Sequence, residues 1–340
     1  FALSGSNTND EIQEIQKQMS PRLAAHRDEI QLNPKLFARV GAVYEQRADL
    51  DLDREQLFLL ENLYERYVRN GALLGDEDQT RLKEINQRLS ELRVKFSRNL
   101  LAETNGFKLV VEDEADLAGL PPAVVETAAA TASREGLENS WVFTTHKPSM
   151  LPFLTYAENR DLREQLYTAY TVRGNQENEF DNKAIMAEIV NLRVEKARLL
   201  GYETFAHYTL ETRMAETPDK VYALLDRLWD ASLPVAKRDV VEMQAIIDSE
   251  GGGFELATWD WWFYAEKLRK AKYDLDDNEL RPYFELNNVR AGVFYVANQL
   301  YGLTFEELEE MPKPHPDAQV FQVFEADGEH AAVIYMDYHP

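Results

Sequence analysis

The 340-residue sequence contains no cysteine. This absence excludes disulfide bonds, thiolate metal ligands and cysteine nucleophiles together. A chain without cysteine suits either the cytoplasm or an exported location. The first residues also lack the basic start and apolar stretch of a secretory signal. We therefore predict a cytoplasmic protein, with the periplasm as the alternative.

Basic residues are in the minority, with 37 Lys and Arg against 60 Asp and Glu, which gives a formal net charge of −23. Such a surface repels phosphate backbones and anionic lipid headgroups, so we expect neither nucleic acid nor a membrane as a partner. No stretch approaches the roughly 18 apolar residues of a membrane-spanning helix. With 44% hydrophobic residues, the chain can nevertheless bury a large core.

Histidines are few and far apart. The closest of the six, His330 and His339, are nine positions apart, and no histidine is followed by glutamate. The helical zinc motif H-E-x-x-H is therefore absent, as are G-x-x-x-x-G-K for phosphate and a serine elbow in a strand-to-helix context. We predict no catalytic residue and no metal ligand in this chain, and we expect no metal bound to it.

Helical periodicity dominates the sequence and predicts a mainly α fold. A helix of about three turns should begin after Asn9, since Asn and Thr residues suited to an N-cap precede its first apolar positions. Further helices are expected from Pro34, after Asp53, from after Gly75–Asp76 to near Asn105–Gly106, from Pro121–Pro122 to Gly136, and over much of 160–300.

Two short β elements interrupt this pattern. Residues 107–111 and 141–145 should pair across the intervening helix, and Asp327–Gly328 between apolar runs predicts a C-terminal hairpin. We expect two domains, a helical lobe with the small β element over 1–250 and aromatic-rich helices with the hairpin over 251–340. Because the chain starts at Phe1 and stops after an apolar run, we also expect both ends to be cut from a longer chain.

Residues 259–264 concentrate three of the five tryptophans with two further aromatic residues. At helical pitch Trp259, Trp262 and Phe263 share one face, whereas Trp261 and Tyr264 lie elsewhere around the cylinder. The first set is expected in the core, and the second set, Trp261 and Tyr264, is the candidate lining of a ligand groove. Core packing alone is the alternative interpretation.

Nine blocks of sequence carry a family likeness, the clearest being Trp-Asp-Trp-Trp-Phe-Tyr-Ala-Glu-Lys at 259–267. The chain resembles the thimet-oligopeptidase-like zinc peptidases, family M3, and within them the bacterial peptidyl-dipeptidases. The blocks occur in the family's order over essentially the whole chain, at residues 3–10, 32–40, 102–105, 157–163, 259–267, 272–276, 281–284, 315–317 and 335–340.

The resemblance implies a half of a clam-like, two-lobed, mainly helical enzyme whose lobes enclose a deep substrate channel. Zinc in that family is held by H-E-x-x-H and a downstream glutamate, which would follow residue 340. The parent enzyme would release C-terminal dipeptides from short peptides, with this chain as an inactive wall of the channel carrying Trp261 and Tyr264. Its partners would be short peptides and the missing catalytic half. The alternative is an acidic helical scaffold or adaptor that binds partner helices in a groove.

Overall fold

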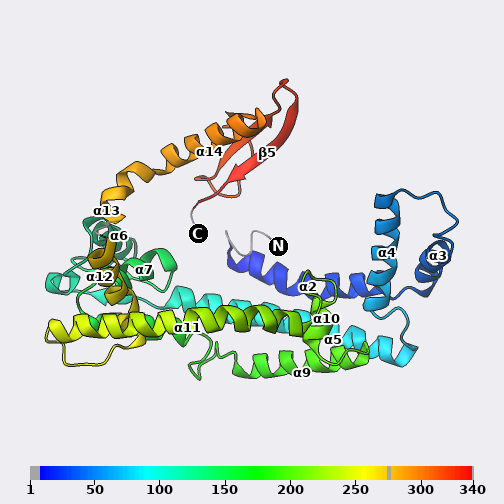
Figure 1. The fold of residues 1–340 in the computed structure, drawn as a ribbon, viewed down its shortest axis with the longest axis horizontal. Coiled ribbons are helices and arrows are strands. Elements are labelled where there is room, and N and C mark those ends of the chain that lie inside the picture. The colour runs from blue at the N-terminus through cyan, green and yellow to red at the C-terminus, as the bar shows by residue number, and fades with distance from the viewer. Residues whose placement is uncertain (1–7, 274–276, 339–340) are drawn as a thin grey trace. The chain divides into compact units, whose positions relative to one another are not determined.

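A computed structural model describes residues 8–273 and 277–338 and is mainly α-helical, as predicted (Figure 1). The chain forms two compact units, one of residues 17–268 and one that combines residues 1–16 with 269–340. Helices α2 and α12 run across this division. The predicted domain boundary after residue 250 stays a prediction.

The larger unit is built mainly from helices, and some of them begin at a capping side chain. Asn33 caps α3 by accepting hydrogen bonds from two backbone amides, and Asp53 forms a capping box with Gln56 at the start of α4. The helices are α2 (Asp10–Gln31), α3 (Pro34–Glu45), α4 (Arg54–Arg69), α5 (Asp76–Gly106), α6 (Pro122–Arg134), α7 (Lys147–Tyr156), α8 (Arg160–Thr171), α9 (Lys183–Leu199), α10 (Phe205–Leu210), α11 (Pro218–Ser249) and α12 (Trp261–Tyr273), with 3₁₀ turns η1 (Glu114–Leu117) and η2 (Thr258–Asp260).

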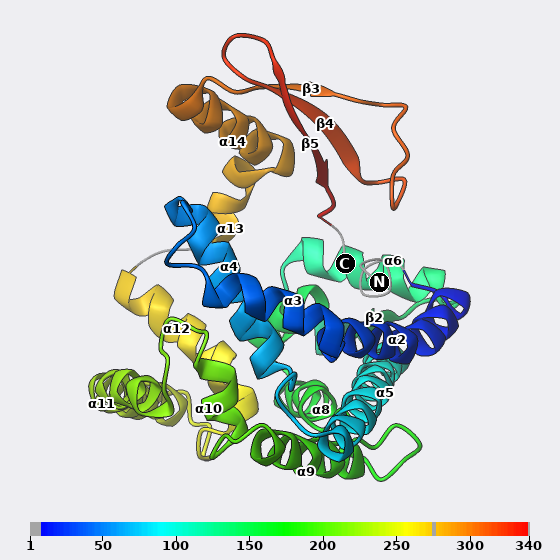
Figure 2. The same ribbon diagram turned by 90° about the vertical axis from the view of Figure 1, so that its right-hand side faces the viewer.

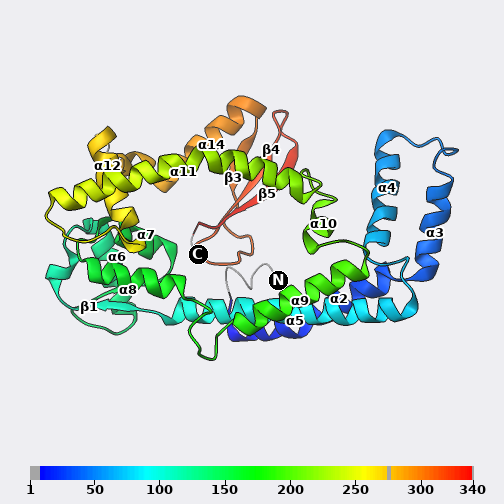
Figure 3. The same cartoon turned by 60° about the horizontal axis from the view of Figure 1, so that its bottom comes forward.

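The long helix α5 packs along α9, and the two run side by side in Figure 3. Its predicted apolar stripe is buried at Leu82, Ile85, Leu89 and Leu92. On the exposed sides, two arginines of α5 each hold a glutamate of α9 through two nitrogens. Arg81 binds Glu195 and Arg88 binds Glu188, each at 2.6 and 2.9 Å. Apolar contacts and paired charges thus fix the register of the two helices.

A second core surrounds the predicted small sheet. Strands β1 (Leu109–Val111) and β2 (Trp141–Phe143) pair antiparallel, with Leu109 opposite Phe143, which confirms the predicted pairing. Phe143 and Phe153 lie with their rings 4.5 Å apart, and residues of α6, α7 and α8 complete the cluster. A third, smaller cluster joins α11 to α12.

The smaller unit packs α14 (Leu286–Tyr301) against a three-stranded antiparallel sheet (Figure 2). Phe294 of the helix stacks on Phe305 at 4.1 Å and meets Phe321 edge-on at 5.1 Å. The unit's other elements are α13 (Asp277–Leu280), η3 (Arg281–Phe284), β3 (Thr304–Glu307), β4 (Gln319–Phe324) and β5 (His330–Met336).

The predicted length of the first helix and the predicted number of strands in the C-terminal sheet were both too small. The first helix is 22 residues long and runs through Pro21, because its distal part packs on α5 through buried Asp28, which accepts a hydrogen bond from Asn86 at 2.9 Å. The predicted two-stranded C-terminal ribbon has a third strand, β3, which pairs with β4. Its two glutamates obscured the apolar pattern, and its Phe305 ring stacks on Phe294 of α14.

Candidate functional site

The aromatic segment that carried the sequence prediction lies on η2 and the first turns of α12. Phe263 and Tyr264 are buried in one cluster with Met243 and Ile247 of α11. Trp262 is half-buried, and its ring lies 6.0 Å from that of Tyr167 on α8. Trp261 is 38% exposed. The two candidate groove residues are therefore not brought together: one faces solvent and the other the core.

The expected packing of this segment is partly wrong. Tyr264, expected apart from the core, is only 5% exposed, and Trp259, expected in the core, is half-buried. The cause is a change of helix type, since Trp259 belongs to the 3₁₀ turn and so does not share the spacing of α12. Burial raises the pKa of the Tyr264 hydroxyl.

A buried ion cluster anchors this segment to α8. The carboxylate of Asp260, fully buried, accepts hydrogen bonds from Arg163 Nη2 at 2.8 Å and from Arg160 Nη2 at 2.9 Å. It also accepts from the backbone N–H of Ala257 at 3.1 Å. Arg163 uses its other terminal nitrogen to bind the carbonyl of Ala157 at 2.7 Å. The cluster therefore satisfies its buried carboxylate from two cations and one backbone donor.

Aromatic rings cover the two cations of this cluster. The guanidinium carbon of Arg160 lies 4.3 Å from the ring centroid of Phe254, and that of Arg163 lies 4.2 Å from the centroid of Phe263. Cations over desolvated ring faces are stabilised by the ring quadrupole. The aromatic segment thus has a structural role that its sequence alone did not indicate. Its rings cover the charged side chains of the cluster.

A second cluster of buried polar side chains lies at the C-terminal end of α5. The carboxylate of Glu103 accepts from the backbone N–H of Gly174 and from Asn178 Nδ2, the latter at 2.7 Å. Beside it, Asn99 donates to Asn182 at 3.0 Å. Gly174 has φ +73°, and a Cβ there would lie 3.1 Å from Asn182 Nδ2. The sequence feature that could have indicated this cluster is the pair Asn99 and Glu103, two polar residues one helical turn apart on the buried side of α5.

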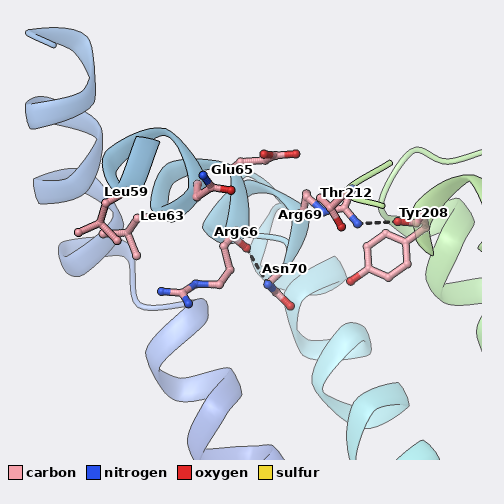
Figure 4. A pocket seen from close by; sticks show the side chains of 9 residues that line it. Leu59, Leu63, Glu65, Arg66, Arg69, Asn70, Tyr208 and Thr212 are labelled. Carbon is pink, nitrogen blue, oxygen red and sulfur yellow. Dashed lines mark hydrogen bonds between the residues drawn. The ribbon is translucent and has the colours of Figure 1, made fainter. Parts of the chain in front are cut away.

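A pocket of about 320 Å³ lies between α4 and α10 (Figure 4). On the α10 side, Arg69 donates to the carbonyl of Tyr208 at 2.5 Å and to the hydroxyl of Tyr202 at 3.2 Å, and it pairs with Glu211. Burial raises the pKa of Tyr208. Sequence reasoning missed this pocket, because its residues come from helices about 140 positions apart. The lining residues are Leu59, Asn62, Leu63, Glu65, Arg66, Arg69, Asn70, Tyr208 and Thr212.

Comparison with known proteins decides the family. The model of peptidase family M3 matches residues 153–340, more than half of the chain. The chain belongs to peptidase family M3. The M3 resemblance drawn from the sequence blocks is therefore confirmed.

Relatives of this M3 chain match it almost from end to end. It is 38% identical over 99% of its length to the dipeptidyl carboxypeptidases of Escherichia coli and Salmonella typhimurium, and 34% identical over 98% to oligopeptidase A of Haemophilus influenzae. In each case it covers 50% of the relative. The M3 chain thus spans about half the length of these curated relatives.

Three of the family-like blocks coincide with the buried clusters of this M3 chain. Residues 157–163 and 259–267 supply the arginines and the aspartate of the ion cluster, and residues 102–105 supply Glu103. Within residues 8–273 and 277–338, no three His, Asp or Glu side chains come together in a group that could hold a metal ion. Nor does any helix of that part of the chain have the length and apolar character to cross a bilayer.

Proposed function

We propose that this M3 chain is one half of a zinc-dependent peptidyl-dipeptidase that releases C-terminal dipeptides from short peptides. The observation that carries the proposal is its 38% identity over 99% of its length to two dipeptidyl carboxypeptidases of which it covers half. In this proposal the chain is a wall of the substrate channel and is inactive alone. Short peptides and the remaining half are its partners, and the cytoplasm is its location.

The chemistry of zinc would belong to the remaining half. The residues that the structure describes offer no set of His, Asp and Glu ligands that fits the metal, and the six histidines are too dispersed to supply a helical pair. No catalytic step is therefore assigned to a residue of this chain. Its own contribution would be to bind and orient the peptide and to limit access to the channel.

An apolar face of α11 supports the need for a further partner. Tyr222, Leu225, Leu228 and Trp229 recur at helical spacing, and each is at least half exposed. A contiguous apolar stripe on an acidic chain is typical of a surface that another protein segment covers. In this proposal the second half of the enzyme covers it.

The C-terminal sheet carries a comparable feature. Strand β5 pairs with β4 on one side, and Val333, Ile334 and Tyr335 are each more than a third exposed. An edge strand with exposed β-branched and aromatic side chains is a template for further pairing. We assign a strand of the second half to this edge.

Trp261 is the better candidate for the channel wall. Its exposed ring can contact a peptide, whereas the Tyr264 ring is buried and would act through the position of α12. Both remain proposed channel residues, the first by contact and the second by positioning. In the full-length enzyme, Trp261→Ala should raise the KM for a short peptide with little change in stability, and Trp259→Ala serves as the aromatic control.

The nucleotide sequence beyond codon 340 separates the peptidase from the acidic scaffold, which the α11 stripe would also suit. We expect an H-E-x-x-H motif followed by a further glutamate. A stop codon or an unrelated domain at that place would contradict the peptidase proposal and favour the scaffold.

A further inference from the structure

The pocket between α4 and α10 is lined by apolar, cationic and acidic side chains. We propose that it binds a small zwitterion with an apolar side chain, of the size of an amino acid or a dipeptide, through its carboxylate on Arg66. The inference goes beyond the proposed peptidase function and does not rest on it, because it concerns residues of this chain alone.

The volume of the pocket limits the size of the ligand. Ligand pockets range from about 300 to 1,000 Å³, so a cavity of about 320 Å³ admits only a small molecule. Leu59 and Leu63 form one apolar part of its lining, and Leu59 is 68% exposed. An aliphatic side chain of the ligand would cover these leucines and remove them from water.

The two arginines of the pocket differ in what they already bind. Arg69 is committed to the Tyr208 carbonyl, the Tyr202 hydroxyl and Glu211. Arg66 lines the same pocket, and no described residue forms an ion pair or hydrogen bond with its guanidinium. A free guanidinium presents a planar fork of donors that matches a carboxylate. In a chain of net charge −23, this unpaired cation is the feature that selects an anionic group.

The remaining polar groups favour a zwitterion over a simple anion. Glu65 also lines the pocket, and its carboxylate has no partner among the described residues, so it would attract an ammonium group and repel a second negative charge. Asn62 and Asn70 donate their amide N–H groups to the carbonyls of Phe58 and Arg66, at 2.7 and 2.6 Å. Their side-chain oxygens are left to accept hydrogen bonds from a ligand.

The geometry places these groups around one cavity. Figure 4 shows Arg66 and the ring of Tyr208 on two sides of the pocket, with Asn70 between them. The Tyr208 and Thr212 hydroxyls lie in the lining and make no hydrogen bond with a described residue. The Tyr208 hydroxyl is protonated at neutral pH and burial raises its pKa further, so this group can donate a hydrogen bond to the ligand.

The test is calorimetric titration of the 340-residue chain, without zinc, using leucyl-leucine as the probe. We expect one saturable site with a Kd below about 1 mM. Arg66→Gln should weaken binding at least tenfold, about the loss of one charge-assisted hydrogen bond. Arg54→Gln is the matched control, because Arg54 is exposed on the same helix and does not line the pocket. Circular dichroism would verify that both variants fold.

Derivatives of leucyl-leucine that lack one terminal charge identify which side chain binds each end of the ligand. Leucyl-leucine amide should bind at least tenfold more weakly than the free acid, and Arg66→Gln should then change its affinity little. N-acetyl-leucyl-leucine should lose affinity on the normal chain but be insensitive to Glu65→Gln. The proposal is overturned if the normal chain shows no saturable binding, if the amide binds as well as the acid, or if Arg54→Gln and Arg66→Gln weaken binding equally.

Discussion

Arg163 donates a hydrogen bond to Asp260 at 2.8 Å, and the two side chains are 1% and 0% exposed. They come from sequence blocks about a hundred residues apart, one at the start of α8 and one just before α12. The contact explains why an aspartate interrupts the densest aromatic run of the chain. The aromatic rings exclude water from an ion pair that joins two helices.

Removing the charge of Asp260 should destabilise the larger unit. Asp260→Asn leaves the buried guanidinium of Arg163 and the half-buried one of Arg160 without their counter-ion, a loss of about 3–5 kcal/mol in the free energy of unfolding. Asp161→Asn is the control, since Asp161 is exposed in the first turn of α8. Urea denaturation followed by circular dichroism measures both. A loss of less than about 1 kcal/mol for Asp260→Asn would contradict the assigned role of the cluster.

Neighbouring aromatic residues of α12 should differ sharply in their effect on stability. Tyr264→Ala empties a site in the core with Met243 and Ile247, and we expect it to cost about 3–5 kcal/mol. Trp261→Ala should cost about 1 kcal/mol or less, because its ring is partly exposed. Thermal and urea unfolding of the two variants provide the comparison. Equal losses would mean that the burial pattern described for α12 is wrong.

Gly174 and Gly201 both have a positive φ, so substitutions at the two positions distinguish the cost of backbone strain from the cost of steric crowding. Gly174→Ala and Gly201→Ala both force alanine to a positive φ, at a cost of about 1–2 kcal/mol. At Gly174 the new Cβ also crowds Asn182, whose hydrogen bond with Asn99 is buried, whereas nothing lies within 4 Å at Gly201. We therefore expect Gly174→Ala to cost about 1 kcal/mol more than Gly201→Ala. Indistinguishable losses of unfolding free energy would argue against a stabilising role of the polar cluster around Asn99 and Asn182.

Acid should weaken the contact between α5 and α9. Hydrogen bonds from Arg88 and Arg81 hold the pKa values of Glu188 and Glu195 below the ordinary glutamate value of about 4.3. The unfolded chain therefore binds protons first, and the stability from these pairs is present above that pH and lost as the pH falls below it. Unfolding free energies between about pH 6 and pH 3 should fall more for the normal chain than for a Glu188→Gln, Glu195→Gln double variant. Parallel curves would contradict this linkage.

Local signals in the sequence account for much of the fold. The apolar stripe from Leu82 to Leu100 predicted one long helix ending near Asn105–Gly106, as α5 does, and Asp327–Gly328 predicted the turn between β4 and β5. Strand β3 was missed because three of its four residues are exposed and its half-buried Phe305 stacks on Phe294, a residue of another element. Where long-range contacts decide a conformation, local patterns carry too little information.

The candidate sites show the same limit. A single aspartate within an aromatic run gave no indication of its partners, since Arg160 and Arg163 lie about a hundred residues away. The pocket of Arg66 and Tyr208 likewise requires two distant helices. The family could be inferred without these contacts, because several blocks in a fixed order are specific even when the role of each block is unknown.

The most direct test of the proposed function is reconstitution. The 340-residue chain and the polypeptide that follows it in the gene would be purified separately, mixed with zinc, and incubated with a short N-blocked peptide, with products followed by mass spectrometry. We predict that the mixture releases C-terminal dipeptides in a chelator-sensitive reaction and that neither piece alone does so. If both pieces fold and associate but release no C-terminal dipeptide, the assignment of this chain as half of a peptidyl-dipeptidase is contradicted.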